Sequence, residues 1–183
     1  MVYIILGKGF EEIEAIAPGD ILRRARIPMK YVGIGGTEIE GAHGIVIHAD
    51  LTIEELEYQS MEMIVLPGGG DGVAAIEANQ RAMDAVTYAV ENHLIVAAIC
   101  AAPSILGKRG WLNGKNAVCY PGFETVMEGA SLKMDQQVVR DDNFITARAP
   151  GAAIEFGLEL AGALHGEYTP EEICDYMVYR RVK

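Results

Sequence analysis

The sequence predicts an α/β fold in which a doubly wound, mostly parallel sheet is sandwiched by helices. Short apolar runs without alternation, such as residues 94–99, are typical of strands buried on both faces of a parallel sheet. These runs alternate along the chain with segments of helical character, the pattern of repeated β-α units. With 183 residues, half of them apolar, we expect a single domain over 1–183, burying roughly 70% of the unfolded surface.

The expected strands are apolar runs that end in turn residues. In chain order they cover residues 2–6, 29–34, 63–66 and 94–99, then a pair at 137–140 and 144–148 joined by the turn 141–143. The alternating residues 45–48 are typical of an edge strand. In an open sheet of order 2-1-3-4-5, the carboxyl ends of the first, third and fourth strands meet at one crevice.

The expected helices begin with acidic residues, caps or prolines and end near basic residues. They cover residues 11–26, 71–93, a segment that begins near Pro103, 152–164 and 169–179, with a short helical start at 52–55. We interpret Glu11 and Glu12 as complements of a helix dipole. Glu14 differs, because its helical neighbours Pro18 and Ile21 place it on a partly buried face. A carboxyl there would have a raised pKa and could donate a hydrogen bond.

Charge and cysteine content exclude several classes of function. A net charge of −11 repels a phosphate backbone, so we expect no nucleic-acid partner. No apolar run is long enough for a membrane span or a signal peptide, so we expect no membrane partner. The three widely spaced cysteines argue against a disulfide framework and for a reducing compartment, which makes the cytoplasm the expected location.

Cys100 is the main candidate for chemistry, because it ends a buried strand and precedes the small residues Ala101 and Ala102 and then Pro103. This pattern predicts a sharp strand-to-helix turn of the nucleophile-elbow kind. A thiol at a helix N-terminus would have a lowered pKa. The alternative is that Cys100 is a buried, unreactive side chain, since free cysteine often packs as a small hydrophobe.

Two further signals fall at the same predicted crevice. The glycine run 68–70 follows a strand end, where backbone N–H groups can approach an anion without interference from a Cβ. Glu14 follows the first strand, so Glu14, the glycine loop and Cys100 converge.

Neither the Gly7-x-Gly9 pair nor the histidines predict a cofactor or metal site. Gly7-x-Gly9 is not a dinucleotide motif, because Glu12 replaces the third glycine. His43 and His48 lack a nearby carboxylate or thiol pattern, so we expect no metal and place both in solvated loop or edge positions.

Four segments together resemble the ThiJ/PfpI superfamily, most closely the branch of the parkinsonism-associated protein deglycase and its bacterial relatives. They are GKGFEEIEAIAPGDILRRA, IVLPGGG, AAICAAPSIL and ITARAPGAAIEFGLEL. The resemblance implies a flavodoxin-like sandwich, like that of class I glutamine amidotransferases, usually in a homodimer and without a cofactor. It implies that Cys100 is the nucleophile or the oxidation-sensitive thiol, with protonated Glu14 as its partner. Gly69 and Ala101 would supply backbone N–H groups to an oxyanion.

The sequence departs from the family pattern at two positions. Ala101 stands where peptidase-like relatives have a histidine after the cysteine, which argues against a Cys-His peptidase. Tyr120 stands before Pro121 where the parkinsonism-associated branch has a histidine, and we consider Asp20 as its hydrogen-bond partner. A tyrosine of ordinary pKa is a poor base at neutral pH.

Three functions therefore stay open. The first is a glyoxalase-type or deglycase-type enzyme, in which Cys100 attacks a small reactive carbonyl or a glycated adduct and Glu14 moves the proton. The second is a redox-sensing or chaperone-like protein whose Cys100 is oxidised to sulfinate. The third is a structural or dimerisation domain with an inert cysteine.

Overall fold

The computed structural model describes residues 1–181 and has the expected α/β architecture. Within these residues, a seven-stranded sheet has the order β10-β11-β7-β6-β1-β2-β5. Five parallel strands form its centre, and they are β1 (Val2–Leu6), β2 (Met29–Gly33), β6 (Met63–Leu66), β7 (Ile95–Ile99) and β11 (Phe144–Ala147). Numbered along the chain, they follow the expected order 2-1-3-4-5.

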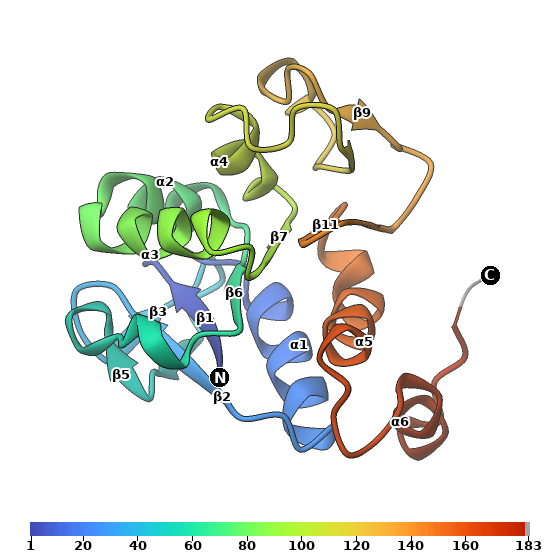
Figure 1. The fold of residues 1–183 in the computed structure, drawn as a ribbon. Helices are drawn as coiled ribbons and strands as arrows, with labels where there is room; N and C mark the ends of the chain where they lie inside the picture. Colours follow the sequence, from blue (N-terminus) through green and yellow to red (C-terminus); the bar gives the residue numbers. More distant parts are fainter. Residues whose placement is uncertain (182–183) are drawn as a thin grey trace.

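Helices cover both faces of this sheet. On one face α1 (Glu12–Arg24) and α5 (Ala153–Leu164) lie side by side, and on the other lie α2 (Gly70–Ala78) and α3 (Gln80–Glu91) (Figure 1). The short α4 (Pro103–Gly107) follows β7, and α6 (Pro170–Met177) packs on α5. None of the helices in residues 1–181 is long and apolar enough to cross a bilayer.

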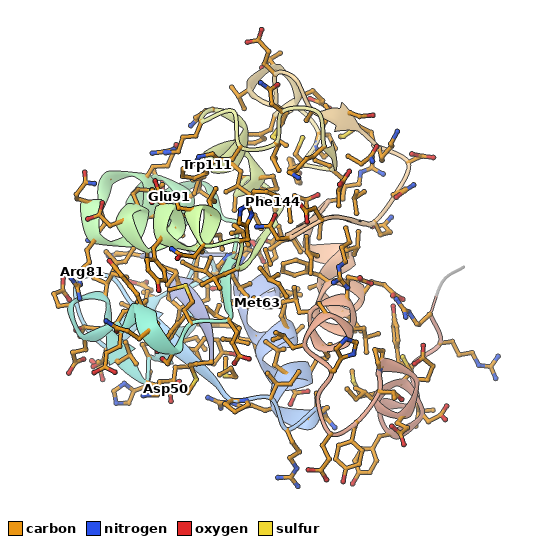
Figure 2. The ribbon with its side chains drawn as sticks, in the orientation of Figure 1. Asp50, Met63, Arg81, Glu91, Trp111 and Phe144 are labelled. Carbon is orange, nitrogen blue, oxygen red and sulfur yellow. The ribbon has the colours of Figure 1, made fainter. Side chains whose placement is uncertain are left out.

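The strands divide their side chains between two hydrophobic cores. In β1, Ile4 and Leu6 face the layer of α1 and α5, whereas Tyr3 and Ile5 face the layer of α2 and α3. Met63 of β6 has no exposed surface and lies inside the molecule, whereas Arg81 lies at its rim (Figure 2). Burial on both faces explains why the central strands are continuous apolar runs in the sequence.

Two predictions about secondary structure were wrong. Residues 71–93 are not one helix but α2 and α3, separated at Asn79, whose side chain accepts a hydrogen bond from the Ala82 N–H (2.9 Å) and so caps α3. Residues 45–48 do not form an edge of the main sheet, because β4 (Val46–His48) pairs with β3 (Glu38–Glu40) in a separate hairpin.

The remaining elements are short. An antiparallel strand, β10 (Val138–Asp141), pairs with β11 at one edge, and β5 (Leu51–Thr52) pairs with β2 at the other. A small parallel pair consists of β8 (Asn116–Ala117) and β9 (Ser131–Leu132). Four 3₁₀ turns in the described residues are η1 (Ile53–Glu55), η2 (Tyr58–Ser60), η3 (Glu124–Val126) and η4 (Pro150–Ala152).

Candidate active site

Cys100 lies at a sharp turn directly after β7, as the sequence predicts. Its φ is 65°, in the left-handed region that non-glycine residues rarely adopt. Two hydrogen bonds hold this conformation: the Cys100 N–H donates to the Ala147 carbonyl (2.9 Å), and the Cys100 carbonyl accepts from the Tyr120 N–H (2.8 Å). The surrounding strands therefore fix the direction of the thiol.

Glu14 is fully buried in the first turn of α1. Its Oε2 accepts a hydrogen bond from the Gly68 N–H (2.7 Å). Its Oε1 is buried and has no hydrogen-bond partner among residues 1–181. A buried polar atom without a partner costs free energy, so such atoms are rare and often serve a function.

The glycine loop after β6 lies against both Glu14 and Cys100. A Cβ added to Gly68 would collide with the Glu14 carboxyl and lie 2.7 Å from the Cys100 Cβ. Gly69 has a φ of 86°, which favours glycine, and its N–H and that of Ala101 act on the Cys100 thiol, where both lower its pKa. The structure therefore places all four expected residues (Glu14, Gly69, Cys100 and Ala101) around one sulfur atom.

The pKa values of Glu14 and Cys100 are both raised. Burial raises the pKa of Glu14 from 4.5 to about 7, although the neighbouring Cys100 thiol and the hydrogen bond from Gly68 oppose this. Burial, followed by the neighbouring Glu14 carboxylate, raises the pKa of Cys100 from 9.0 to about 12, against the two backbone N–H groups. Between these two values the pair carries one proton and one negative charge, and the thiol with the carboxylate is the main form, because the thiol has the higher pKa.

The expected lowering of the thiol pKa by a helix N-terminus was therefore wrong. The helix α4 is only five residues long and begins three residues after Cys100, so its dipole acts weakly on the sulfur. Burial and the adjacent carboxylate dominate instead. The helix therefore does not lower the pKa of Cys100.

Tyr120 and Asp20 do not form the hydrogen bond that the sequence allowed. Asp20 accepts from the Arg24 side chain (2.6 Å) and lies six residues beyond Glu14 on α1, about 9 Å further along the helix axis. Tyr120 touches the site through its backbone N–H, and its side chain is 43% exposed, with no side-chain hydrogen bond in residues 1–181. Neither side chain therefore supports Cys100 in this structure.

A second carboxylate, Glu12, forms a network that sequence reasoning missed. Its Oε2 lies 2.8 Å from His43 Nδ1, and its Oε1 accepts from the His43 backbone N–H (2.7 Å) and the Ile45 N–H (3.4 Å). Glu12 is only 4% exposed, so it is more than a complement of the helix dipole. The expectation that His43 has no nearby carboxylate was also wrong, because the contact spans 31 residues and left no local pattern.

The ligand atoms of Glu11, Glu12 and His43 lie within 4.8 Å of one another. The Glu12 carboxylate is already occupied by N–H donors, and burial, which would raise its pKa, is outweighed by those hydrogen bonds, so that the pKa is lowered. The His43 ring is exposed, as expected, and its hydrogen bond to Glu12 raises its pKa. This arrangement is accounted for as an ion pair that holds the loop 41–45, and the absence of a metal stays a prediction.

Comparison with known proteins adds to this geometry. The model of the DJ-1/PfpI family matches residues 1–163. This chain belongs to the DJ-1/PfpI family. It is 34% identical over 173 residues to protein dj-1beta of Drosophila melanogaster (93% of this chain, 92% of that protein), whose crystal structure superposes with a TM-score of 0.92, at 32% identity and with 98% of each chain covered.

Two further relatives in the DJ-1/PfpI family carry names that describe an activity. A deglycase of Pyrococcus abyssi is 30% identical over 151 residues, which cover 82% of this chain and 90% of that protein. A glutathione-independent glyoxalase of Caenorhabditis elegans is 29% identical over 156 residues, which cover 85% and 83%. The family resemblance and the flavodoxin-like fold expected from the sequence are thus confirmed.

Proposed function

We propose that this protein is a cofactor-independent, cysteine-dependent enzyme of the glyoxalase or deglycase type that acts on reactive carbonyls. One observation carries this proposal. The Gly69 and Ala101 N–H groups lower the pKa of the Cys100 thiol, which lies beside the buried Glu14 carboxyl, whose Oε1 has no hydrogen-bond partner in residues 1–181. A nucleophile, an oxyanion site and a proton carrier are the groups that carbonyl addition needs. The glyoxalase and deglycase relatives support the same substrate class.

In the first step the Cys100 thiolate attacks the aldehyde carbon of an α-oxoaldehyde. A carbon–sulfur bond forms, and the carbonyl electron pair moves to oxygen, which takes the proton from the Glu14 carboxylic acid. The product is a hemithioacetal. Glu14 must first act as a base: its carboxylate, which forms above a pKa of about 7, takes the thiol proton, and the resulting thiolate and carboxylic acid then react together.

In the second step the Glu14 carboxylate removes the hydrogen from the carbon bonded to sulfur. The resulting enediol regains a proton at the neighbouring carbon, which yields a thioester. Water then hydrolyses the thioester to a hydroxy acid and the free thiol. One water molecule is added overall and nothing is oxidised or reduced in net terms, so the cycle needs no cofactor.

The decisive experiment compares cysteine variants with methylglyoxal as substrate. Cys100→Ala should lose turnover to lactate entirely, whereas Cys174→Ser should keep it, because Cys174 lies on α6, outside the site. Lactate is measured directly, since loss of methylglyoxal alone also reports its addition to surface lysines and arginines. Unchanged lactate formation in Cys100→Ala would refute the enzyme function.

A second candidate function is supported by the same geometry. A sulfinate on Cys100 would place its oxygens near the Gly69 and Ala101 N–H groups, and protonated Glu14 could donate to one of them through Oε1. Mild hydrogen peroxide should then add two oxygen atoms to Cys100 and none to Cys119, which has no exposed surface. Equal oxidation of both cysteines, measured by peptide mass spectrometry, would count against a sensor role.

The peptidase function has less support. No histidine in residues 1–181 forms a hydrogen bond with Cys100 or influences its pKa. The carboxylate that does influence it is itself half protonated near neutral pH. A protein with only an inert cysteine would have no use for the strained turn and the unpartnered carboxyl oxygen.

We further propose a cytoplasmic homodimer. The three cysteines are free, which suits a reducing compartment. Ile16 on the outer face of α1 and Val46 of the β3–β4 hairpin are exposed, at 37% and 57%, and exposed apolar side chains of this kind are suited to a subunit interface. Analytical ultracentrifugation tests the dimer: a monomer at micromolar concentration would refute it.

A further inference from the structure

A cleft with an unbalanced negative charge adjoins the segments that hold Cys100. The cleft is lined by Glu11, Glu12, Ile13, His43, Ile45 and Pro150. It adjoins the site on two sides. On one side, the Glu11 N–H donates to the Gly68 carbonyl (3.0 Å). On the other side, Pro150 lies three residues after Ala147, whose carbonyl accepts a hydrogen bond from the Cys100 N–H.

The two carboxylates of this cleft differ in how far hydrogen-bond donors and positive groups neutralise their charge. Glu12 is paired with His43 and with backbone N–H groups. Glu11 accepts no hydrogen bond through its side chain within residues 1–181, and its Oε1 is 3.7 Å from His43 Nδ1, whose closer partner is Glu12. Neither lysine nor arginine lines the cleft. Glu11 therefore leaves a net negative charge in the cleft next to the Gly68 loop and Cys100.

Partial burial makes this charge effective. The Glu11 side chain is only 16% exposed, so its field is screened less than that of a fully solvated carboxylate. The other walls, Ile13, Ile45 and Pro150, are apolar and suit a short hydrocarbon group. The cleft thus combines apolar contact with repulsion of anions.

We infer that Glu11 is a specificity-determining residue that admits neutral and cationic carbonyl compounds to Cys100 and excludes anionic ones. Neutral α-oxoaldehydes and carbonyl adducts on amines or guanidines would enter, whereas α-oxo acids and phosphorylated carbonyls would be disfavoured. The substrate names rest on the proposed function, but the charge selection does not, because it applies to any reagent that reaches the sulfur.

Alkylation of Cys100 tests this selection without requiring turnover. The alkylation rates with neutral iodoacetamide and anionic iodoacetate are measured in a Cys119→Ser/Cys174→Ser background. The ratio of these two rates is then divided by the corresponding ratio for N-acetylcysteine. The background protein should prefer iodoacetamide, and Glu11→Gln should reduce this preference about fivefold, from one unit charge acting over several ångströms. Added salt should also weaken the preference in the background protein and have little effect in Glu11→Gln.

Matched variants separate a local charge from the charge of the whole protein. Glu54→Gln changes an exposed carboxylate elsewhere and should leave the ratio unchanged, whereas Glu11→Lys should favour iodoacetate. An unchanged ratio in both Glu11 variants would overturn the inference, and so would failure of both reagents to reach Cys100. Normal selection in a protein that forms no lactate would support the inference and refute only the proposed enzyme function.

Discussion

Glu12 and Glu14 lie two residues apart in the first turn of α1, and both are buried, yet their surroundings differ. Glu12 accepts hydrogen bonds at both carboxylate oxygens, and these outweigh the effect of burial, so its pKa is lowered. Glu14 accepts one, from Gly68, and burial raises its pKa to about 7. Glu14 lies deeper in the protein and Glu12 has more donors, so depth of burial and hydrogen bonds together set the two pKa values.

This difference separates a structural role from a chemical one. Glu12 stays ionised and holds the loop 41–45 through His43 and Ile45. Glu14 can change its protonation state near neutral pH, and its free Oε1 is available to a reacting group. Each carboxyl is also approached closely by one glycine, Gly68 beside Glu14 and Gly41 beside Glu12.

The largest expected effect on turnover comes from filling the space at Gly68 with a methyl group. Gly68→Ala would push Glu14 and Cys100 apart, and we expect turnover to fall about a hundredfold or more, since a shift of about 1 Å at a reacting centre has this effect. Gly70→Ala is the matched control, because a Cβ there meets nothing within 4 Å, and it should keep activity. Equal activity of the two variants would contradict the geometry proposed for the site.

Gly41→Ala tests the structural role of Glu12. A Cβ at residue 41 would lie 2.5 Å from the Glu12 carboxyl, so we expect a loss of about 1–3 kcal/mol in the free energy of unfolding from overpacking. Turnover per folded molecule should fall much less than in Gly68→Ala. Denaturant melts read together with lactate formation check this, and a variant as inactive as Gly68→Ala would show that the loop 41–45 belongs to the chemistry.

The next effect is the loss of proton transfer. Glu14→Gln cannot exchange a proton with Cys100, and we expect lactate formation to fall by about 10²–10⁴. Glu12→Gln keeps Glu14 intact and should stay within a few-fold of the parent. Comparable losses in both variants, each verified as folded by circular dichroism, would remove the distinction between the two carboxyls.

The same two variants should shift stability in opposite directions. Glu14 has a folded-state pKa raised from 4.5 to about 7, so its contribution to stability is fully present below pH 4.5 and is lost as pH rises through 7. Glu14→Gln should therefore be more stable than the parent at pH 8, by up to about 3 kcal/mol. Glu12 has a lowered pKa, so its contribution is present above pH 4.5 and is lost as pH falls.

Urea unfolding between pH 4 and pH 8 measures both trends. The difference between parent and Glu14→Gln should grow with pH, whereas Glu12→Gln should be less stable than the parent at pH 7 and approach it in acid. A Glu14→Gln variant that is less stable than the parent at pH 8 would show that the buried carboxyl is better satisfied than its hydrogen bonds indicate.

The smallest effect is expected at Tyr120. Its phenol is 43% exposed and is not bonded to Asp20, so Tyr120→Phe should change lactate formation less than about twofold. Its backbone N–H, which holds the Cys100 carbonyl, is unchanged by this substitution. A tenfold loss would assign the hydroxyl a direct role and would reopen the comparison with relatives that carry a histidine there.

The sequence predicted the parts of the site that depend on topology. Glu14, Gly69 and Cys100 follow the ends of three strands, and the order of a doubly wound sheet brings such ends together. Predictions made from neighbouring residues were wrong where the decisive contacts come from residues far away in the sequence. The thiol pKa is raised first by burial and then by Glu14, which lies 86 residues earlier in the chain, and Glu12 meets His43 across 31 residues. By contrast, the break between α2 and α3 had a local signal, the Asn79 cap, that the apolar pattern obscured.

The pH dependence of Cys100 alkylation by iodoacetamide tests the central claim most directly. In the Cys119→Ser/Cys174→Ser background, the rate should rise as pH passes about 7, because the Glu14 carboxylate that forms there can accept the proton of the Cys100 thiol. In Glu14→Gln this rise should disappear and move above pH 9, since the buried thiol then ionises alone. The same curve in both proteins, with a midpoint near the ordinary thiol value of about 8.5, would contradict the shared proton and the mechanism built on it.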